Sequence, residues 1–221
     1  MADLASTGFI FDCDGTLIDS IEAWLDAEGE VARGAGVVLS KEQRDELNTL
    51  TLPEAGDFFH ERFGIGKSGA AVVAQIDAFM LDFYRERAEG RPGALAFVRS
   101  LREQGARITV ASSSPRAFLE AGLERAGFAP YLDAIVSVDD VEGSKRDPFI
   151  FRRCCAIMGV DPQRTWGFDD SVYALESMAS EGVRCVGVYS SELCSTEDEL
   201  AGSSELVIRD FLGLDPQRFA L

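Results

Sequence analysis

Short apolar runs that end in a polar residue recur along the 221-residue chain and alternate with segments of helical periodicity. The helical spacing is clear where apolar residues return every three or four positions, as at Leu95, Val98 and Leu101. Strands and helices that alternate in this way form β-α-β units around a parallel sheet. The sequence therefore predicts an α/β fold, a doubly wound, Rossmann-like sheet with helices on both faces. The runs are at residues 7–12, 107–114, 133–140, 165–170 and 183–190, with a weaker one at 204–210.

One long segment interrupts the alternation after the first run. Residues 18–89 contain no strand-like run, but capping boxes beginning at Ser40 and Thr51 mark helix starts. A connection of roughly 70 residues is too long for an ordinary β-α link. We therefore predict a helical domain at residues 18–89, inserted into a catalytic α/β core made of residues 1–17 and 90–221.

Polar residues before prolines predict several helix starts in the core. Ser114, Asp147 and Asp161 each precede a proline, and this order places a capping side chain before a proline at the first helical position. Thr196 and Glu199 fit a capping box. We expect helices to begin directly after each of these capping residues.

The charge of the chain restricts its partners. A formal net charge of −17 makes nucleic acid and anionic membranes unfavourable partners. No apolar stretch reaches about 18 residues, so no membrane span is expected. The first residues carry an acid in place of the positive charge of a signal peptide, and this favours a cytoplasmic protein. The sequence leaves the oligomeric state open, and a monomer is compatible with it.

The cysteines favour packing over chemistry. Their number is five, and no C-x-x-C pair occurs, so zinc and a disulfide framework both lack support. Cys13 stands between two aspartates, and an anionic neighbourhood raises the pKa of a thiol and leaves less thiolate. We therefore interpret Cys13 as a small buried residue and not as a nucleophile.

Chemically informative residues stand where the predicted strands end. In an open parallel sheet, ligands bind beyond the carboxyl ends of the strands, near the point where the strand order reverses. Carboxylates gathered at one edge need a cation, and hard oxygen ligands favour Mg²⁺. A lysine and free backbone N–H groups would add the local positive potential that a phosphate requires. The residues concerned are Asp12, Asp14, Ser112, Ser113, Ser114, Lys145, Asp169 and Asp170.

Four motifs in this order and spacing resemble those of the haloacid dehalogenase-like superfamily. They are "DCDGTLIDS" from Asp12, "VASSSP" from Val110, the single residue Lys145, and "FDDS" from Phe168. The helical insert after the first strand resembles the type-I cap of that family. The resemblance covers nearly the whole chain and implies a magnesium-dependent enzyme that hydrolyses phosphoric monoesters.

The resemblance also implies residue roles. Asp12 would be the nucleophile that forms an aspartyl-phosphate, and Asp14 the general acid and base. Mg²⁺ would bind a side-chain oxygen of Asp12, the backbone carbonyl of Asp14, and Asp170. Asp169 would bind the metal either directly or through a water.

The same motifs imply the residues on the substrate side of the site. Ser112 would hold a phosphate oxygen together with the backbone N–H of Ser113, and Thr16 is a further substrate-binding candidate. Lys145 would neutralise both the nucleophile and the transferring group. The family usually has a proline after this lysine, whereas Arg146 stands here. The expected substrate is a small phosphorylated metabolite.

Two alternatives stay open from the sequence. A phosphomutase of the β-phosphoglucomutase type shares all four motifs, but Leu52 stands where that group has a cap arginine for the second phosphate. Arg62, Arg85 and Arg87 are the cap arginines that could replace it. A non-catalytic phosphate-binding or regulatory protein would lack Asp12 or Asp14, and both are present. Hydrolysis is therefore the favoured prediction.

Overall fold

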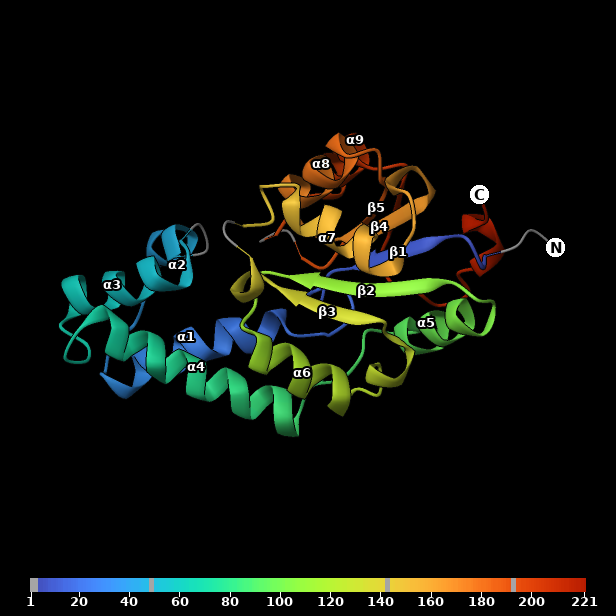
Figure 1. Ribbon diagram of the computed structural model, residues 1–221. Helices are drawn as coiled ribbons and strands as arrows, with labels where there is room; N and C mark the ends of the chain where they lie inside the picture. The colour runs from blue at the N-terminus through green and yellow to red at the C-terminus, as the bar shows by residue number, and fades with distance from the viewer. Residues whose placement is uncertain (1–3, 48–49, 142–143, 192–193) are drawn as a thin grey trace. The chain divides into compact units, whose positions relative to one another are not determined.

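In the computed structural model, which describes residues 4–47, 50–141, 144–191 and 194–221, the predicted strands form one sheet (Figure 1). The strand order is β3-β2-β1-β4-β5-β6, and every neighbouring pair is parallel. The chain moves outward from β1 to β3 and then returns to the other side of β1, so the order reverses between β1 and β4. The predicted fold class is confirmed. The strands are β1 Gly8–Phe11, β2 Arg107–Ser112, β3 Ala134–Ser137, β4 Thr165–Asp169, β5 Arg184–Val188 and β6 Leu206–Ile208.

Helices cover both faces of this sheet. Helices α5 and α6 lie on one face, and α7, α8 and α9 lie on the other (Figure 1). These helices are α5 Ala94–Glu103, α6 Arg116–Arg125, α7 Phe149–Met158, α8 Val172–Ser180 and α9 Glu197–Ser203. Short 3-10 turns lie at Ala129–Tyr131, Val138–Asp140, Pro162–Arg164 and Pro216–Phe219.

Strand β1 is buried on both faces because its side chains alternate between two cores. Phe9 and Phe11 point into an aromatic cluster that also contains Phe97 and Phe168. Ile10 points to the opposite face and joins the aliphatic core beneath α7 and α8. A strand packed on both sides reads as a continuous apolar run, which is why the residues of β1 stood out in the sequence.

Two of the helices predicted to start at a proline begin one residue later in the structure. Helix α6 begins at Arg116, and the side chain of Ser114 does not cap it, so the predicted capping role of Ser114 is wrong. Helix α7 begins at Phe149, whose N–H donates to the Asp147 carboxylate at 2.9 Å. Asp161 caps as predicted, but the element that it caps is a 3-10 turn. Proline occupies the N-cap in α6 and α7 because its fixed φ also suits that position.

The predicted capping boxes are present. The Thr196 hydroxyl accepts from the N–H of Glu199, whose carboxylate accepts from the Thr196 N–H. In the inserted segment, the Thr51 N–H donates to the Glu54 carboxylate at 2.7 Å, and Pro53 occupies the first turn. These local signals are reliable because each is complete within four residues.

The chain divides into two compact units, one comprising Met1–Ile21 and Arg87–Leu221, the other Glu22–Glu86. The predicted bounds, 18–89 for the insert, stand a few residues outside this division. The described residues of the second unit form helices and loops without a strand. Its role as a cap stays a prediction. Its helices are α1 Ile21–Gly34, whose first residue belongs to the first unit, α2 Lys41–Leu47, α3 Leu52–Phe63 and α4 Gly69–Glu86.

The two ends of the insert run side by side within the first unit. Ile18 and Gly90 form an antiparallel bridge. Next to it, the N–H of Arg91 donates to the carbonyl of Leu17 at 2.8 Å. The chain therefore leaves and re-enters the core through one paired segment, which we call the linker pair (residues 17–19 and 89–91).

Candidate active site

The carboxyl ends of β1 and β4 bring three predicted acids together. The two strands are neighbours, and the Asp12 N–H continues their pairing by donating to the Phe168 carbonyl at 2.9 Å. Carboxylate oxygens of Asp12, Asp169 and Asp170 lie within 4.8 Å of one another. All three residues are buried. The acids meet at the point where the strand order reverses, the position at which doubly wound sheets bind ligands.

Lys145 lies between two of these acids. Its Nζ is 2.6 Å from Asp12 Oδ1 and 2.6 Å from Asp169 Oδ2, and the lysine is only 3% exposed. Burial opposes charge on this ammonium, but the attraction of Asp12 and Asp169 outweighs it and raises the pKa of Lys145 well above its usual range. Lys145 is therefore a fixed positive charge, held against Asp12 at the loop between β3 and α7.

The acidic cluster carries more negative charge than one lysine can balance. Burial raises the pKa of Asp12 to about 7, and the attraction of Lys145 only partly opposes this rise. Burial likewise raises the pKa values of Asp169 and Asp170 to about 6 each. Buried oxygens at this spacing, with unbalanced charge, are the donors that a divalent cation such as Mg²⁺ selects. The residues present thus fit a metal site.

Asp14 has partners different from those of Asp12. Its Oδ1 accepts a hydrogen bond from the Ser20 hydroxyl at 2.6 Å, and its Oδ2 accepts one from the Ser114 hydroxyl at 2.6 Å. Neither serine was assigned this role from the sequence. Ser114 belonged to the quoted serine run, but its partner is 100 positions away, and no local pattern carries that information.

Asp170 is enclosed by hydroxyls and by a glycine. Its Oδ2 accepts from the Ser190 hydroxyl at 2.7 Å, and its Oδ1 from the Ser171 hydroxyl at 3.1 Å. Gly15, with φ of +73°, stands against the same carboxylate, since a Cβ there would lie 2.2 Å from Oδ2. Glycine at this position therefore provides both the left-handed turn and the space for the acid.

The predicted phosphate-binding residues are distributed around the end of β2 and the turn after β1. Ser112 is buried, and its hydroxyl accepts from the Ser114 N–H at 3.1 Å. Ser113 is exposed. Thr16 is completely buried, and its hydroxyl has no hydrogen-bond partner among the described residues. Their roles toward a substrate stay predictions.

Cys13 is a packing residue. It is completely buried between the two aspartates of the first motif. Burial, with the charges of Asp14 and Asp12, raises the pKa of its thiol well above the usual range. The thiolate required of a nucleophile is therefore strongly disfavoured at neutral pH.

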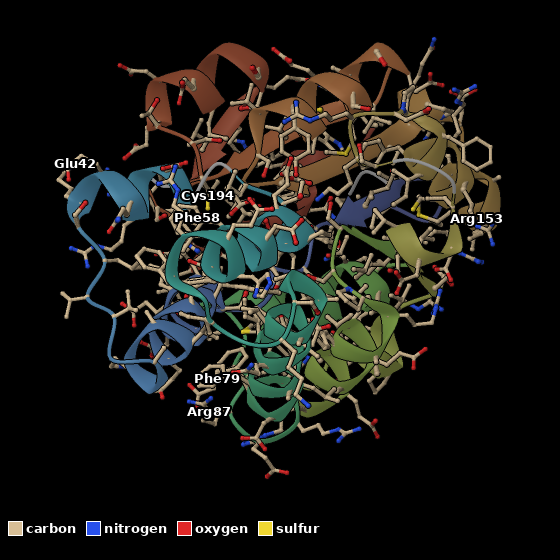
Figure 2. All side chains as sticks on the ribbon, turned by 90° about the vertical axis from the view of Figure 1, so that its left-hand side faces the viewer. Glu42, Phe58, Phe79, Arg87, Arg153 and Cys194 are labelled. Carbon is tan, nitrogen blue, oxygen red and sulfur yellow. The ribbon has the colours of Figure 1, made fainter. Side chains whose placement is uncertain are left out.

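Three arginines bear on the mutase alternative, and the structure describes the surroundings of each. Arg62 donates to both carboxylate oxygens of Glu46, at 2.8 and 2.7 Å, and stacks over Phe58. Arg85 and Arg87 stand at the end of α4 and directly after it, and both are exposed (Arg87 is labelled in Figure 2). Of the stretch aligned with the mutase arginine, residues 48 and 49 lie outside the described residues.

Known proteins are similar to this chain in sequence. A family model of haloacid dehalogenase-like hydrolases matches residues 7–182. Hexitol phosphatase B of Escherichia coli (strain K12) is 30% identical over 214 residues, covering 92% of this chain and 96% of that protein. Validoxylamine A 7'-phosphate phosphatase of Streptomyces hygroscopicus subsp. limoneus is 26% identical over 202 residues, with coverage of 91% and 92%.

A solved structure supports the fold. The crystal structure of CbbY from Rhodobacter sphaeroides in complex with phosphate superposes with a TM-score of 0.80 at 23% identity, covering 100% of this chain and 99% of that one. Among the described residues, no helix combines the length and apolar character needed to cross a membrane. The predicted enzyme class, a phosphoric monoester hydrolase, is confirmed by the family match and the phosphatases among the relatives. With most of its length matched by the family and its four motifs gathered at one sheet edge, the chain belongs to the haloacid dehalogenase-like hydrolases.

Proposed function

We propose that this chain is a magnesium-dependent phosphatase that hydrolyses a small phosphate monoester through an aspartyl-phosphate on Asp12. The observation that carries the proposal is the ion pair of Lys145 with Asp12 at 2.6 Å, beside Asp169 and Asp170. A carboxylate paired with a fixed cation, together with further acids at one sheet edge, provides a nucleophile, a counter-charge and metal ligands.

Asp12 would supply the attacking oxygen. Its free carboxylate oxygen attacks phosphorus, an Asp–O–P bond forms, and the bond from phosphorus to the substrate oxygen breaks. Lys145 favours the charged form of Asp12 by direct contact with Oδ1, in opposition to burial, and offsets the charge of the phosphate that arrives. Because both groups are buried, this attraction is weakened little by solvent.

Asp14 would move the protons. It gives a proton to the leaving alkoxide in the first step and takes one from the attacking water in the second, which releases phosphate and restores Asp12. The hydroxyls of Ser20 and Ser114 fix the plane of the Asp14 carboxyl group. A serine hydroxyl can also accept a hydrogen bond, so these two contacts are compatible with a carboxyl group that gives and takes a proton.

Asp12, the Asp14 backbone carbonyl and Asp170 would hold the metal. Mg²⁺ in that place would neutralise phosphate oxygens and hold the substrate in line with the nucleophile. Asp169 has both oxygens engaged, one by Lys145 and the other by the Ser171 N–H at 3.0 Å. These contacts favour a role for Asp169 in holding Lys145, with any metal contact made through a water.

The substrate class we propose is a phosphorylated sugar or related polyol. The support is the hexitol phosphatase at 30% identity, together with the smaller likeness to validoxylamine A 7'-phosphate phosphatase. The net charge of −17 agrees with a small ligand whose charge is met locally by Lys145. Hydrolysis is favoured over mutase activity because Leu52 stands where the mutase arginine is aligned, and because Arg62, one possible replacement, is paired with both carboxylate oxygens of Glu46.

The test measures phosphate release from an aryl phosphate and from a panel of sugar and hexitol phosphates. We expect activity that disappears with a chelator and returns with Mg²⁺, and no activity in Asp12→Asn. A coupled assay for glucose 6-phosphate, run on glucose 1-phosphate with a bisphosphate activator, reports mutase activity in the same sample. Full activity in chelator would refute the metal assignment, and isomerisation faster than phosphate release would establish the mutase.

A further inference from the structure

Arg91 joins three segments of the core that are distant in sequence. It lies in the linker pair, and its guanidinium donates to the backbone carbonyls of Gly15 at 2.9 Å and Tyr189 at 3.0 Å. A third bond, of 2.5 Å, goes to the carbonyl of Arg209. These carbonyls come after β1, β5 and β6 respectively. A planar guanidinium with donors in a fixed fork can hold several acceptors at set distances, which a lysine cannot do.

Two of the segments that Arg91 holds enclose Asp170. Gly15 stands against Asp170 Oδ2, where a Cβ would be 2.2 Å away. Ser190 directly follows Tyr189, and its hydroxyl donates to the same oxygen at 2.7 Å. The guanidinium thus holds both segments that stand against Asp170 Oδ2.

We infer that Arg91 is a positioning residue for the metal site, acting on Asp170 through the Gly15 turn and through Ser190. The inference rests on the proposed function, because it takes Asp170 as a metal ligand. Mg²⁺ demands nearly ideal octahedral geometry, so a small displacement of one carboxylate weakens binding. Gly15 also follows Asp14, whose backbone carbonyl is a second proposed ligand, so loosening this turn would disturb two ligands at once.

The first experiment measures Mg²⁺ binding without turnover. Calorimetric titration of the protein with Mg²⁺ alone gives Kd, and the rise of the thermal midpoint with Mg²⁺ checks it. We expect Arg91→Met to raise the Kd for Mg²⁺ by about 10-fold, as is typical when a residue that orients a metal ligand is lost. Arg91→Lys should fall between Arg91→Met and the unchanged protein.

A matched control uses a second arginine nearby in the sequence. Arg99 lies on α5, with a side chain more than half exposed and an ion pair to Glu103 at 3.5 Å. Arg99→Met removes the same charge and the same length of side chain as Arg91→Met. It should leave the Mg²⁺ Kd unchanged, so a change specific to Arg91→Met reflects its contacts and not the net charge.

A double-mutant cycle tests the route through Ser190. Ser190→Ala alone should weaken Mg²⁺ binding several-fold. In Arg91→Met, where Ser190 is no longer held, adding Ser190→Ala should weaken binding less than it does in the unchanged protein. A role in folding alone would leave Kd unaffected or make the two changes additive.

The outcomes separate this inference from the proposed function. A folded Arg91→Met protein with unchanged Mg²⁺ Kd, or additive effects in the cycle, overturns the positioning role. Should Arg91→Met fail to fold, the same comparison is made with Arg91→Lys and Ser190→Ala. If the protein without substitutions does not bind Mg²⁺, both proposals are overturned. Mg²⁺ binding that depends on Arg91 without phosphate release overturns only the proposed function.

Discussion

Asp12 and Asp14 are two residues apart, yet their surroundings differ in kind. Asp12 contacts a buried ammonium, whereas Asp14 accepts hydrogen bonds from two hydroxyls. An ammonium has no acceptor and favours the charged carboxylate, while a hydroxyl can donate or accept and suits a group that changes its protonation. The contacts therefore favour different roles for two side chains of the same type.

Replacing Asp14 by Asn separates these roles. With an aryl phosphate, whose leaving group needs no proton, Asp12 should still become phosphorylated. Hydrolysis of that intermediate should slow, and turnover should fall by about 10²–10⁴-fold. Intact-mass measurement after mixing should show a species with one added phosphoryl group. Asp12→Asn should show no such species, and normal turnover in Asp14→Asn would contradict the assignment.

The sequence carried the site residues but not the residues that orient them. Asp12 and Asp170 could be proposed because each stands directly after a strand within a short motif, whereas Lys145 was proposed from its place in the order of the family motifs. Ser20, Ser114 and Arg91 were not assigned because their roles depend on contacts that the fold creates. Arg91 reaches carbonyls 76, 98 and 118 positions away, and a local pattern holds no information at that range.

Helices α3 and α4 meet at a pair of glycines. A Cβ on Gly56 would lie 2.5 Å from the carbonyl oxygen of Gly69 and 2.6 Å from a methyl group of Val73. In the reverse direction, a Cβ on Gly69 would lie 2.9 Å from the backbone nitrogen of Asp57. The obstacles include backbone atoms, which cannot rotate away, so close approach of the two helices requires glycine.

Two Gly→Ala substitutions should therefore have opposite effects. Gly56→Ala should lower the free energy of unfolding by about 1–3 kcal/mol, because overpacking outweighs the better helix propensity of alanine. In α1, a Cβ on Gly29 would meet only the far end of the Arg33 side chain, at 3.9 Å. Gly29→Ala should therefore raise the free energy of unfolding by about 0.5–1 kcal/mol. Urea unfolding of both variants tests this, and a stabilised Gly56→Ala would show that the helices can separate.

Elements were predicted better than their ends. Every predicted strand is present because its run is apolar, short and bounded by polar residues. The helix starts after Ser114 and Asp147 were misplaced by one residue, since proline suits both the N-cap and the first helical position. At Ser114 the tertiary hydrogen bond to Asp14 replaced the local cap.

The acidic cluster makes the stability of the folded protein depend on pH. In the folded protein the pKa of Asp12 is about 7, and those of Asp169 and Asp170 are about 6, all well above the usual pKa of an aspartate. Between about pH 4 and 7 the folded state thus binds more protons than the unfolded state. The stability that these groups contribute is present at low pH and is lost as pH rises through 6 and 7.

Mg²⁺ should restore that stability where the carboxylates are charged. We expect a larger rise in thermal midpoint with Mg²⁺ at pH 8 than at pH 5, since protons compete for the same oxygens. Glu28 in α1, whose pKa burial raises to about 7, adds to the pH dependence but lies outside the acidic triad. The change in thermal midpoint on adding Mg²⁺ at each pH is therefore the quantity to compare. Equal Mg²⁺ responses at both pH values, or a full response in Asp170→Asn, would contradict the site.

The linker pair has a consequence for how such a chain can change over evolutionary time. The bridge between Ile18 and Gly90 brings the start and the end of a long excursion to one place. An inserted segment whose two ends are adjacent can be lengthened, shortened or exchanged without moving any strand of the sheet. The chemistry at the sheet edge and the segment that begins at Glu22 can then be inherited as separate modules.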